Sequence, residues 1–184
     1  MKLSSQELQE IINGNQVGSE WPFMGGTPDD VEVHLRMIMQ SLNASYGIEV
    51  DGEFDHYGSG YASYVHLFCK RPKDASTYQR DGRKWTDGIA VYLSRLAPVA
   101  VLGAETRTVF NRGSSHGFLD ANSIDSLPDE TWSEEKTIIE SILVEEGYEL
   151  ASGDEMKAPL PFDSTIKSAF DDKSVFDAIF YWED

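Results

Sequence analysis

The stretch GIAVYLSRLAPVAVLGAETRTVF, residues 88–110, decides the fold class. It contains two apolar segments, 88–97 and 99–110, which Pro98 separates. Continuous apolar segments of this length, bounded by turn residues, are typical of strands in the middle of a sheet that is covered on one or both faces. We therefore predict that the two segments form two central strands of a sheet.

The residues before this stretch predict an antiparallel pair of strands. Residues 48–54 alternate between apolar and polar side chains, residues 55–61 are rich in turn formers, and residues 62–70 are strongly β-prone. Two such segments on either side of a turn are typical of a hairpin. Cys69 lies in the second segment, where we expect a small buried side chain rather than a reactive thiol.

Capping patterns and apolar periodicity predict three helices along the rest of the chain. We expect them at residues 5–13, 28–46 and 133–146. The clearest of them begins with Thr27, a residue type that caps helix N-termini, and with Pro28 at the first helical position. His34 is out of phase with the apolar stripe of this helix, so we expect it on the surface. A glycine follows each helix, as is typical of helix ends.

The last ten residues, VFDAIFYWED (175–184), predict a short fourth helix at about 174–181. Ser174 and Asp177 have the spacing of a capping box, with Asp in place of the usual Glu. The apolar side chains fall at i, i+1, i+4 and i+5 from Val175, which is a helical stripe. We expect this stripe to close the core, so removal of the ten residues should unfold the protein.

Together these elements predict one α+β domain that spans residues 1–184. Helices pack on a mostly antiparallel sheet of about four to six strands. A chain of 184 residues is long enough for one hydrophobic core and short for two.

The net charge is strongly negative and unevenly distributed. The sequence has 15 Lys and Arg residues against 32 Asp and Glu residues, a net charge of −17. Residues 120–184 hold 18 acidic residues and four basic ones, whereas residues 70–84 hold six basic residues and two acidic ones. An electric field of this sign repels phosphate backbones and anionic lipids and attracts cationic surfaces. We therefore expect no direct contact with nucleic acid or membrane, and we interpret the basic segment 70–84, which includes Tyr78, as a loop between strands.

Composition also predicts the compartment. A single cysteine rules out an internal disulfide framework and a cysteine-rich zinc site. The N-terminus has no apolar region of the kind that signal peptides contain, and no run approaches 18 apolar residues. These features predict a cytoplasmic protein.

The segment GSSHG, residues 113–117, matches the G-x-S-x-G pattern of a hydrolase nucleophile. In that fold the catalytic histidine follows the serine later in the chain, whereas the last histidine of this sequence is His116, inside the motif. We therefore interpret the segment as a glycine-rich surface loop. The carboxylates of Asp51, Glu53 and Asp55 lack the remaining ligands of a calcium loop, because Ala62 stands where the bidentate Glu would be. The sequence thus predicts no metal site and no cofactor.

Two functional predictions follow. The first is a non-enzymatic module that docks a basic protein, such as a toxin or a nucleic-acid-binding protein, through its acidic C-terminal third. Its size and charge resemble those of bacterial toxin-immunity proteins, although no family motif matches residue by residue. The residues expected to bind the partner are Asp129, Glu130, Trp132, Glu134, Glu135, Glu145 and Glu146.

The alternative is a small enzyme whose site is assembled from scattered polar residues around 55–57 and 107–116. General acid–base chemistry requires imidazole, carboxylate or phenol groups that lie close together. The residues that we would expect in such a site are Asp55, His56, Tyr57, Arg107, Arg112 and His116.

Overall fold

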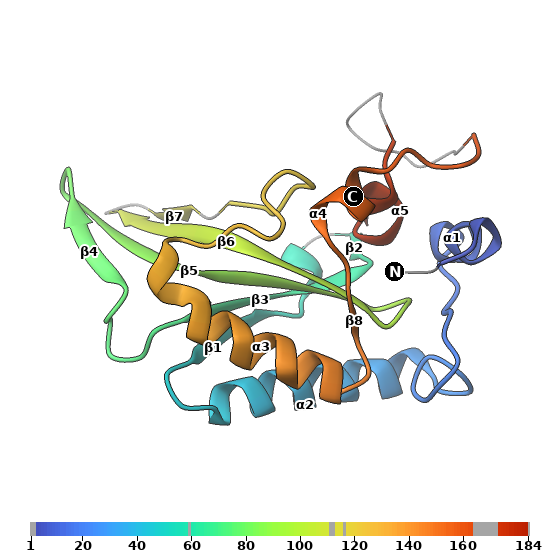
Figure 1. Ribbon diagram of the computed structural model, residues 1–184, viewed down its shortest axis with the longest axis horizontal. Coiled ribbons are helices and arrows are strands. Elements are labelled where there is room, and N and C mark those ends of the chain that lie inside the picture. The colour runs from blue at the N-terminus through green and yellow to red at the C-terminus, as the bar shows by residue number, and fades with distance from the viewer. Residues whose placement is uncertain (1–2, 59, 111–112, 116, 164–172, 184) are drawn as a thin grey trace.

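A long twisted sheet forms the centre of the protein, and helices pack against both of its faces (Figure 1). The structure is a computed structural model, and it describes residues 3–58, 60–110, 113–115, 117–163 and 173–183. The helices are α1 (Ser5–Ile12), α2 (Pro28–Ala44), α3 (Ser133–Glu145), α4 (Gly153–Lys157) and α5 (Val175–Ile179), with the 3-10 turns η1 (His56–Gly58) and η2 (Glu130–Trp132). The strands are β1 (Glu49–Glu53), β2 (Tyr61–Ala62), β3 (Tyr64–Lys70), β4 (Thr77–Arg80), β5 (Arg83–Ser94), β6 (Val99–Phe110), β7 (Gly113–Ser115), β8 (Glu149–Leu150) and β9 (Trp182–Glu183).

The main sheet confirms the predicted α+β class with mostly antiparallel strands. Its order is β1-β3-β5-β6-β7, with β4 added to β5 and the two-residue β8 added in parallel to β6, which makes seven strands. The two apolar segments that decided the fold class form β5 and β6, which pair with each other around the turn that contains Pro98. β2 and β9 form a separate two-stranded sheet.

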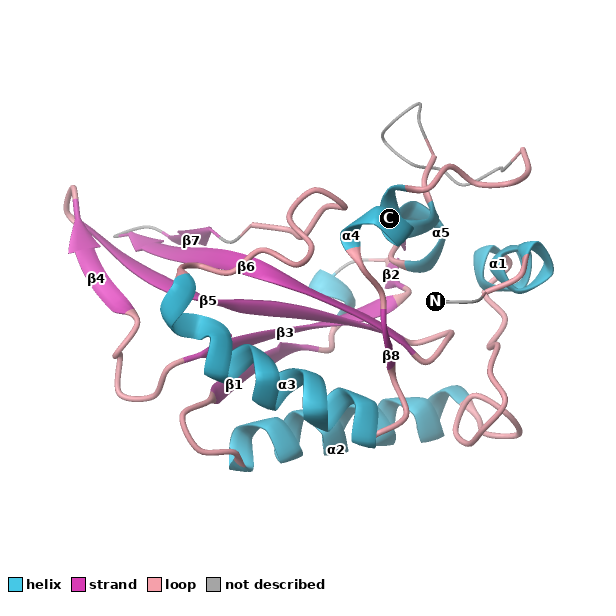
Figure 2. Ribbon diagram, in the orientation of Figure 1, coloured by secondary structure: helices cyan, strands magenta, loops and turns pink. Residues whose placement is uncertain are grey.

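Alternation along the strands divides the core into two parts. Val65 and Val91 face α2 and α3, whereas their neighbours Tyr64 and Tyr92 face the other side. Figure 2 shows α2 and α3 side by side under the sheet, with α4 and α5 on the opposite side. Successive side chains of a strand point to opposite faces, so continuous apolar strands need cover on both. We predicted central strands that are covered on one or both faces of the sheet. In the structure both faces are covered.

The helix boundaries lie within two residues of the predicted ones. Of the four predicted helices, the C-terminal one is the shortest. It ends at Ile179, and the chain continues to β9. The side chain of Ser63 contacts the backbone at the point where α5 ends. Its Oγ accepts a hydrogen bond from the Tyr181 N–H (2.9 Å) and lies 2.8 Å from the carbonyl oxygen of Ile179. A tertiary contact, which no local pattern reveals, thus decides where this helix ends.

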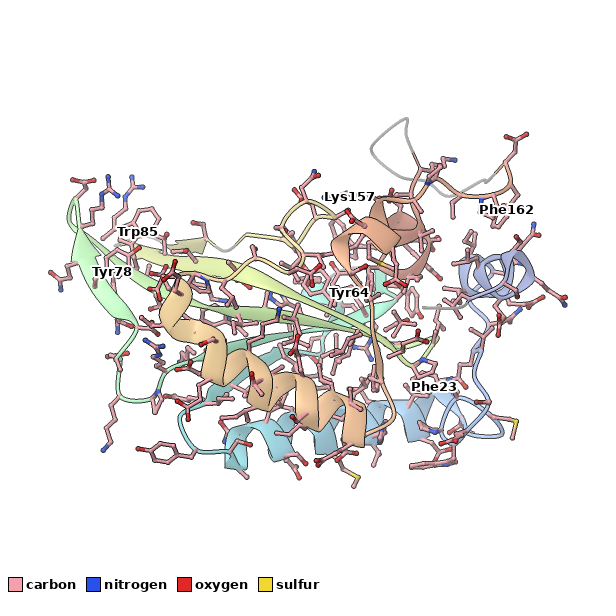
Figure 3. All side chains as sticks on the ribbon, viewed as in Figure 1. Phe23, Tyr64, Tyr78, Trp85, Lys157 and Phe162 are labelled. Atoms are coloured by element: carbon pink, nitrogen blue, oxygen red, sulfur yellow. The ribbon has the colours of Figure 1, made fainter. Side chains whose placement is uncertain are left out.

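Some local predictions are wrong. Residues 113–115, part of the segment that we interpreted as a glycine-rich surface loop, form β7, which pairs with the end of β6. His34 is buried, with only 8% of its surface exposed. The segment that follows α3 covers His34, because the His34 Nε2 donates to the carbonyl oxygen of Glu146 (3.2 Å) and its ring stacks on Tyr148. The basic segment 70–84 is not a loop, since it contains β4 and the start of β5. Tyr78 and Trp85 face each other in this hairpin, at the end of the sheet that lies far from α4 (Figure 3).

Candidate functional site

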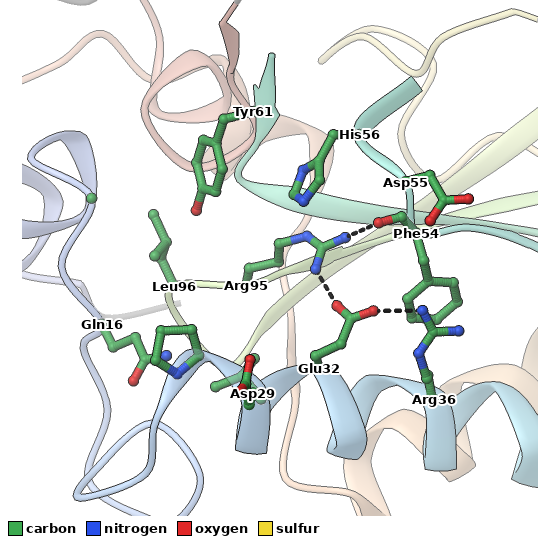
Figure 4. A pocket seen from close by; sticks show the side chains of 13 residues that line it. Gln16, Asp29, Glu32, Arg36, Phe54, Asp55, His56, Tyr61, Arg95 and Leu96 are labelled. Atoms are coloured by element: carbon green, nitrogen blue, oxygen red, sulfur yellow. Dashed lines mark hydrogen bonds and ion pairs between the residues drawn. The ribbon is translucent and has the colours of Figure 1, made fainter. Parts of the chain in front are cut away.

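A cavity lies between the N-terminal end of α2, the η1 turn and the β5–β6 turn, and we call it the arginine cavity. Its volume is about 680 Å³, and its lining includes Arg95, Leu96, Phe54 and Tyr61. Figure 4 shows the lining residues, with Arg95 between the side chains that enter from α2 and those that enter from the opposite side. Pockets of this size that combine apolar walls with a few polar groups are the usual places for ligands.

An ion-pair network forms one wall of the arginine cavity. Arg95 donates to the Glu32 carboxylate and to the carbonyl oxygen of Phe54 (2.9 Å). The other oxygen of Glu32 accepts from Arg36 (2.8 Å), whose guanidinium lies 4.1 Å from the centre of the Phe54 ring. The Glu32 carboxylate therefore forms ion pairs with both Arg36 and Arg95, so these three side chains carry one net positive charge.

His56 enters the same cavity in a fixed tautomer. Its Nδ1 accepts a hydrogen bond from the backbone N–H of Ala62 (2.9 Å), so this nitrogen carries no proton and the neutral ring holds its proton on Nε2. The ring stacks on that of Tyr61, with 5.4 Å between the centroids. His56 and Tyr57 both have positive φ angles, 54° and 56°. Non-glycine residues adopt this conformation at some cost, and such residues concentrate at functional sites.

The structure divides the residues predicted for an enzyme site. Asp55 and His56 line the arginine cavity. Tyr57 turns the other way and lines a small cavity of about 120 Å³ together with Arg107. The remaining two candidates, Arg112 and His116, lie outside the described residues.

A buried polar network links Tyr57 to Arg107 through two residues that the sequence analysis missed. The Tyr57 hydroxyl lies 3.3 Å from His66 Nδ1, and His66 Nε2 lies 2.7 Å from Glu105 Oε2. The other carboxylate oxygen of Glu105 accepts from Arg107 Nε (2.9 Å). The side chains of His66 and Glu105 are only 1% and 2% exposed. The sequence contains one signal for this network, because His66 and Glu105 are polar residues inside apolar strands. Buried polar groups require hydrogen-bond partners, so such residues indicate a partner elsewhere in the fold.

Two opposing effects act on the pKa of Glu105. Burial of the carboxyl acts to raise its pKa, but the hydrogen bond from His66, the charge of His66 and the charge of Arg107 outweigh burial. The pKa of Glu105 therefore lies below its usual value, and the carboxyl is ionised at neutral pH. Cys69, on the other face of β3, is buried as predicted, and burial raises the pKa of its thiol to about 12.

Two of the acids predicted to bind a partner line a second cavity, which we call the acidic cavity. Its volume is about 500 Å³. The residues that define it are Glu20, Trp21, His34, Glu145, Glu146 and Glu149. Lys and Arg are absent from its described lining. Trp21 is 58% exposed, so its ring is accessible beside four carboxylates.

The other predicted partner residues surround η2, and they fall into two groups. Trp132 is only 2% exposed, and the guanidinium of Arg71 covers its ring at 4.4 Å. Arg71 Nε also donates to Glu135 (2.5 Å), which neutralises that carboxylate. Trp132, which we expected among the partner-binding residues, therefore packs in the core and offers a partner almost no accessible surface. The acids that stay exposed here are Asp129, Glu130 and Glu134.

Much of the positive charge of the basic segment is paired within the protein. Lys70 lies 3.1 Å from Asp51, and Lys84 lies 3.1 Å from Asp74. Both interactions, like that of Arg71, offset local acids rather than form a free cationic surface. This arrangement gives no support to a nucleic-acid-binding surface on this segment.

The described residues contain neither a metal-binding group nor a membrane-spanning helix. Across the part of the chain that the structure describes, no three His, Cys, Asp or Glu side chains form a group that could hold a metal ion. Of the described helices, none is long and apolar enough to cross a membrane. The chain matches no protein-family model, no curated protein and no solved structure.

Proposed function

We propose that this protein is an acidic module that binds a basic protein partner, in the manner of an immunity or inhibitor protein. The observation that carries this proposal is the acidic cavity. Four glutamates from two distant parts of the sequence meet there, and its described lining contains no Lys or Arg. A concave surface of one sign of charge concentrates the field and accelerates the association of an oppositely charged partner.

The exposed ring of Trp21 supports the same proposal. Its edge meets the buried His34 ring at 5.9 Å between centroids, which holds the indole at the border of the acidic cavity. Arginine binds both to carboxylates and to the faces of aromatic rings, and Trp and Arg are the residues most enriched at binding hot spots. We therefore expect the partner to present an arginine-rich surface to this cavity.

The double substitution Glu145→Gln and Glu146→Gln tests the proposal. We expect the affinity for a captured basic partner to fall about tenfold, mainly through slower association, and the dependence of affinity on salt to become weaker. Binding would be measured by surface plasmon resonance over a salt series. The matched control is Asp74→Asn with Asp81→Asn, which removes two charges beside the β4–β5 hairpin, at the far end of the sheet (Figure 1). Equal affinities and equal salt slopes for the two double variants would show that only net charge matters.

A small enzyme is the second candidate, and the polar network favours it. A hydroxyl that faces an imidazole, which a carboxylate holds on its other side, is the arrangement that activates nucleophiles. Tyr57, His66 and Glu105 have this order, whereas burial raises the pKa of the Tyr57 hydroxyl and opposes its activation. If the network is catalytic, Tyr57→Phe should abolish hydrolysis of p-nitrophenyl esters or phosphates and should lower the free energy of unfolding by only about 1 kcal/mol. Activity that is equal in wild type and Tyr57→Phe would exclude this role.

A further inference from the structure

The arginine cavity presents hydrogen-bond donors that have no partner among the described residues. His56 holds its neutral-form proton on Nε2, because Nδ1 accepts from Ala62. The hydroxyl of Tyr61 and the side-chain amide of Gln16 also border the cavity without a described hydrogen bond. Figure 4 shows Tyr61 and His56 entering the cavity side by side above Arg95. A bound group that accepts hydrogen bonds would satisfy these donors together.

The charge of the adjacent wall favours an anionic acceptor. Glu32 is the only carboxylate in the network with Arg36 and Arg95, and both of its oxygens are engaged. The wall therefore keeps one positive charge that the described protein does not balance at contact distance. Asp29 and Asp55 also line the cavity, so its charged lining residues sum to −1, but both acids are exposed and form no described ion pair with Arg36 or Arg95. Acids elsewhere in the chain act from farther away, and salt screens them beyond about 8–10 Å.

The remaining lining residues limit which other chemical groups a bound anion can contain. Val31, Phe54 and Leu96 are buried apolar residues of the lining, so they suit a ring or an alkyl group. Asp29 and Asp55 are exposed lining residues, and they would repel a second negative charge. Phosphate dianions and dicarboxylates therefore fit the cavity poorly.

We propose that the arginine cavity binds a small molecule through a single carboxylate group, with the remainder of the molecule apolar or cationic. The carboxylate accepts hydrogen bonds from His56 and Tyr61 and lies next to the Arg36–Glu32–Arg95 wall. The left-handed backbone at His56 holds the imidazole in the position that this contact requires. This site is separate from the acidic cavity, so the proposal does not depend on the docking function.

Titration with benzoate tests the proposal, with benzamide as the neutral analogue and phthalate as the dianion. Two-dimensional NMR of the ¹⁵N-labelled protein would follow the Ala62 backbone amide and the Gln16 side-chain amide. We expect saturable shifts with benzoate at millimolar concentrations, and binding at least tenfold weaker for benzamide and phthalate. Equal binding of benzoate and benzamide, or no shift at either amide with benzoate, would overturn the proposal.

Variants separate the site from the fold. Tyr61→Phe removes one hydroxyl and should weaken benzoate binding at least about tenfold, because hydrogen bonds to charged groups are stronger than those between neutral groups. Tyr46→Phe is the matched control, since Tyr46 is 93% exposed and does not line the cavity. The spectrum of Tyr61→Phe without benzoate shows whether the fold is intact. Unchanged benzoate affinity in folded Tyr61→Phe would contradict the proposed contact.

Discussion

Replacement of Glu105 by alanine is expected to lower the free energy of unfolding by about 3–5 kcal/mol at neutral pH. The Glu105 side chain is 2% exposed and accepts from both His66 and Arg107. Its loss leaves the His66 imidazole, only 1% exposed, without the carboxylate at its Nε2. A buried polar group that loses its partner is costly, because water cannot replace the missing hydrogen bond. Urea unfolding followed by circular dichroism measures the change.

The control variants distinguish the ion pair from simple loss of a side chain. Asp81→Asn removes the charge of a carboxylate that is 84% exposed, and Asn tolerates the left-handed backbone at this position (φ 52°), so the free energy of unfolding should change by less than about 0.5 kcal/mol. The double substitution His66→Leu with Glu105→Met replaces the buried pair by apolar groups of similar volume. We expect it to recover most of the loss, since such replacements are often neutral or stabilising. A Glu105→Ala protein as stable as the wild type would show that the pair contributes nothing.

The pair also makes stability depend on pH. The pKa of Glu105 is lower in the folded protein than in the unfolded chain, where an ordinary Glu titrates near about 4.3. The stabilisation from this carboxylate is therefore fully present above pH 5 and is lost as pH falls through the lowered folded pKa. We expect the stability difference between wild type and Glu105→Gln to shrink as pH falls below about 4. A difference that stays constant from pH 7 to pH 3 would contradict this linkage.

The sequence predicted the elements of the fold well because their determinants are local. Thr27 caps α2 as predicted, and Ser174 forms the predicted capping box with Asp177. Ser4 forms a capping box at the start of α1. The antiparallel pair β1–β3 was predicted from the turn between its strands. The other strand pairings are not local, so the order of the sheet stayed unknown. His66 and Glu105 are 39 residues apart, and only the order β3-β5-β6 brings them together. The polar network could therefore be suspected from two polar residues in apolar strands, but its members could not be paired.

In the candidate sites, too, local features were predicted and the spatial arrangement of side chains was not. Sequence analysis grouped Asp55, His56 and Tyr57 because they are adjacent, but two left-handed residues in succession send His56 and Tyr57 into different cavities. It also counted acids along the chain, which identified Glu145 and Glu146 but missed Glu20, whose place in the acidic cavity depends on the path of the N-terminal loop. Neighbouring positions in the sequence thus showed where acidic residues concentrate, but they did not show the directions in which the side chains of His56 and Tyr57 point.

Deletion of residues 175–184 is expected to unfold the protein rather than only to impair binding. The deleted segment contains α5, whose Ile179 is fully buried, and Phe180, which is 6% exposed. These side chains pack with Tyr64 and Tyr92 on the sheet face opposite α2 and α3. The Tyr181 hydroxyl also donates to the carbonyl oxygen of Ile11 at the end of α1 (3.2 Å), so the segment ties both ends of the chain to the core.

The magnitude follows from the buried side chains. Truncation of a buried Phe or Ile to Ala typically costs about 2–5 kcal/mol, and whole domains are stable by only about 5–15 kcal/mol. Loss of Ile179 and Phe180 with the rest of α5 therefore removes most or all of the net stability. We expect the truncated protein to lack a cooperative thermal transition, as measured by calorimetry, and to show the broad amide spectrum of an unfolded chain.

A point substitution keeps this prediction decidable if the truncated protein cannot be purified. Phe180→Ala should lower the free energy of unfolding by about 3–5 kcal/mol, whereas Tyr46→Ala, which removes a ring that is 93% exposed, should have little effect. The C-terminal aromatic residues would then belong to the core. Equal stability of the two variants, or a truncated protein that melts cooperatively near the wild-type temperature, would mean instead that the C-terminal segment is an accessory surface available to a partner.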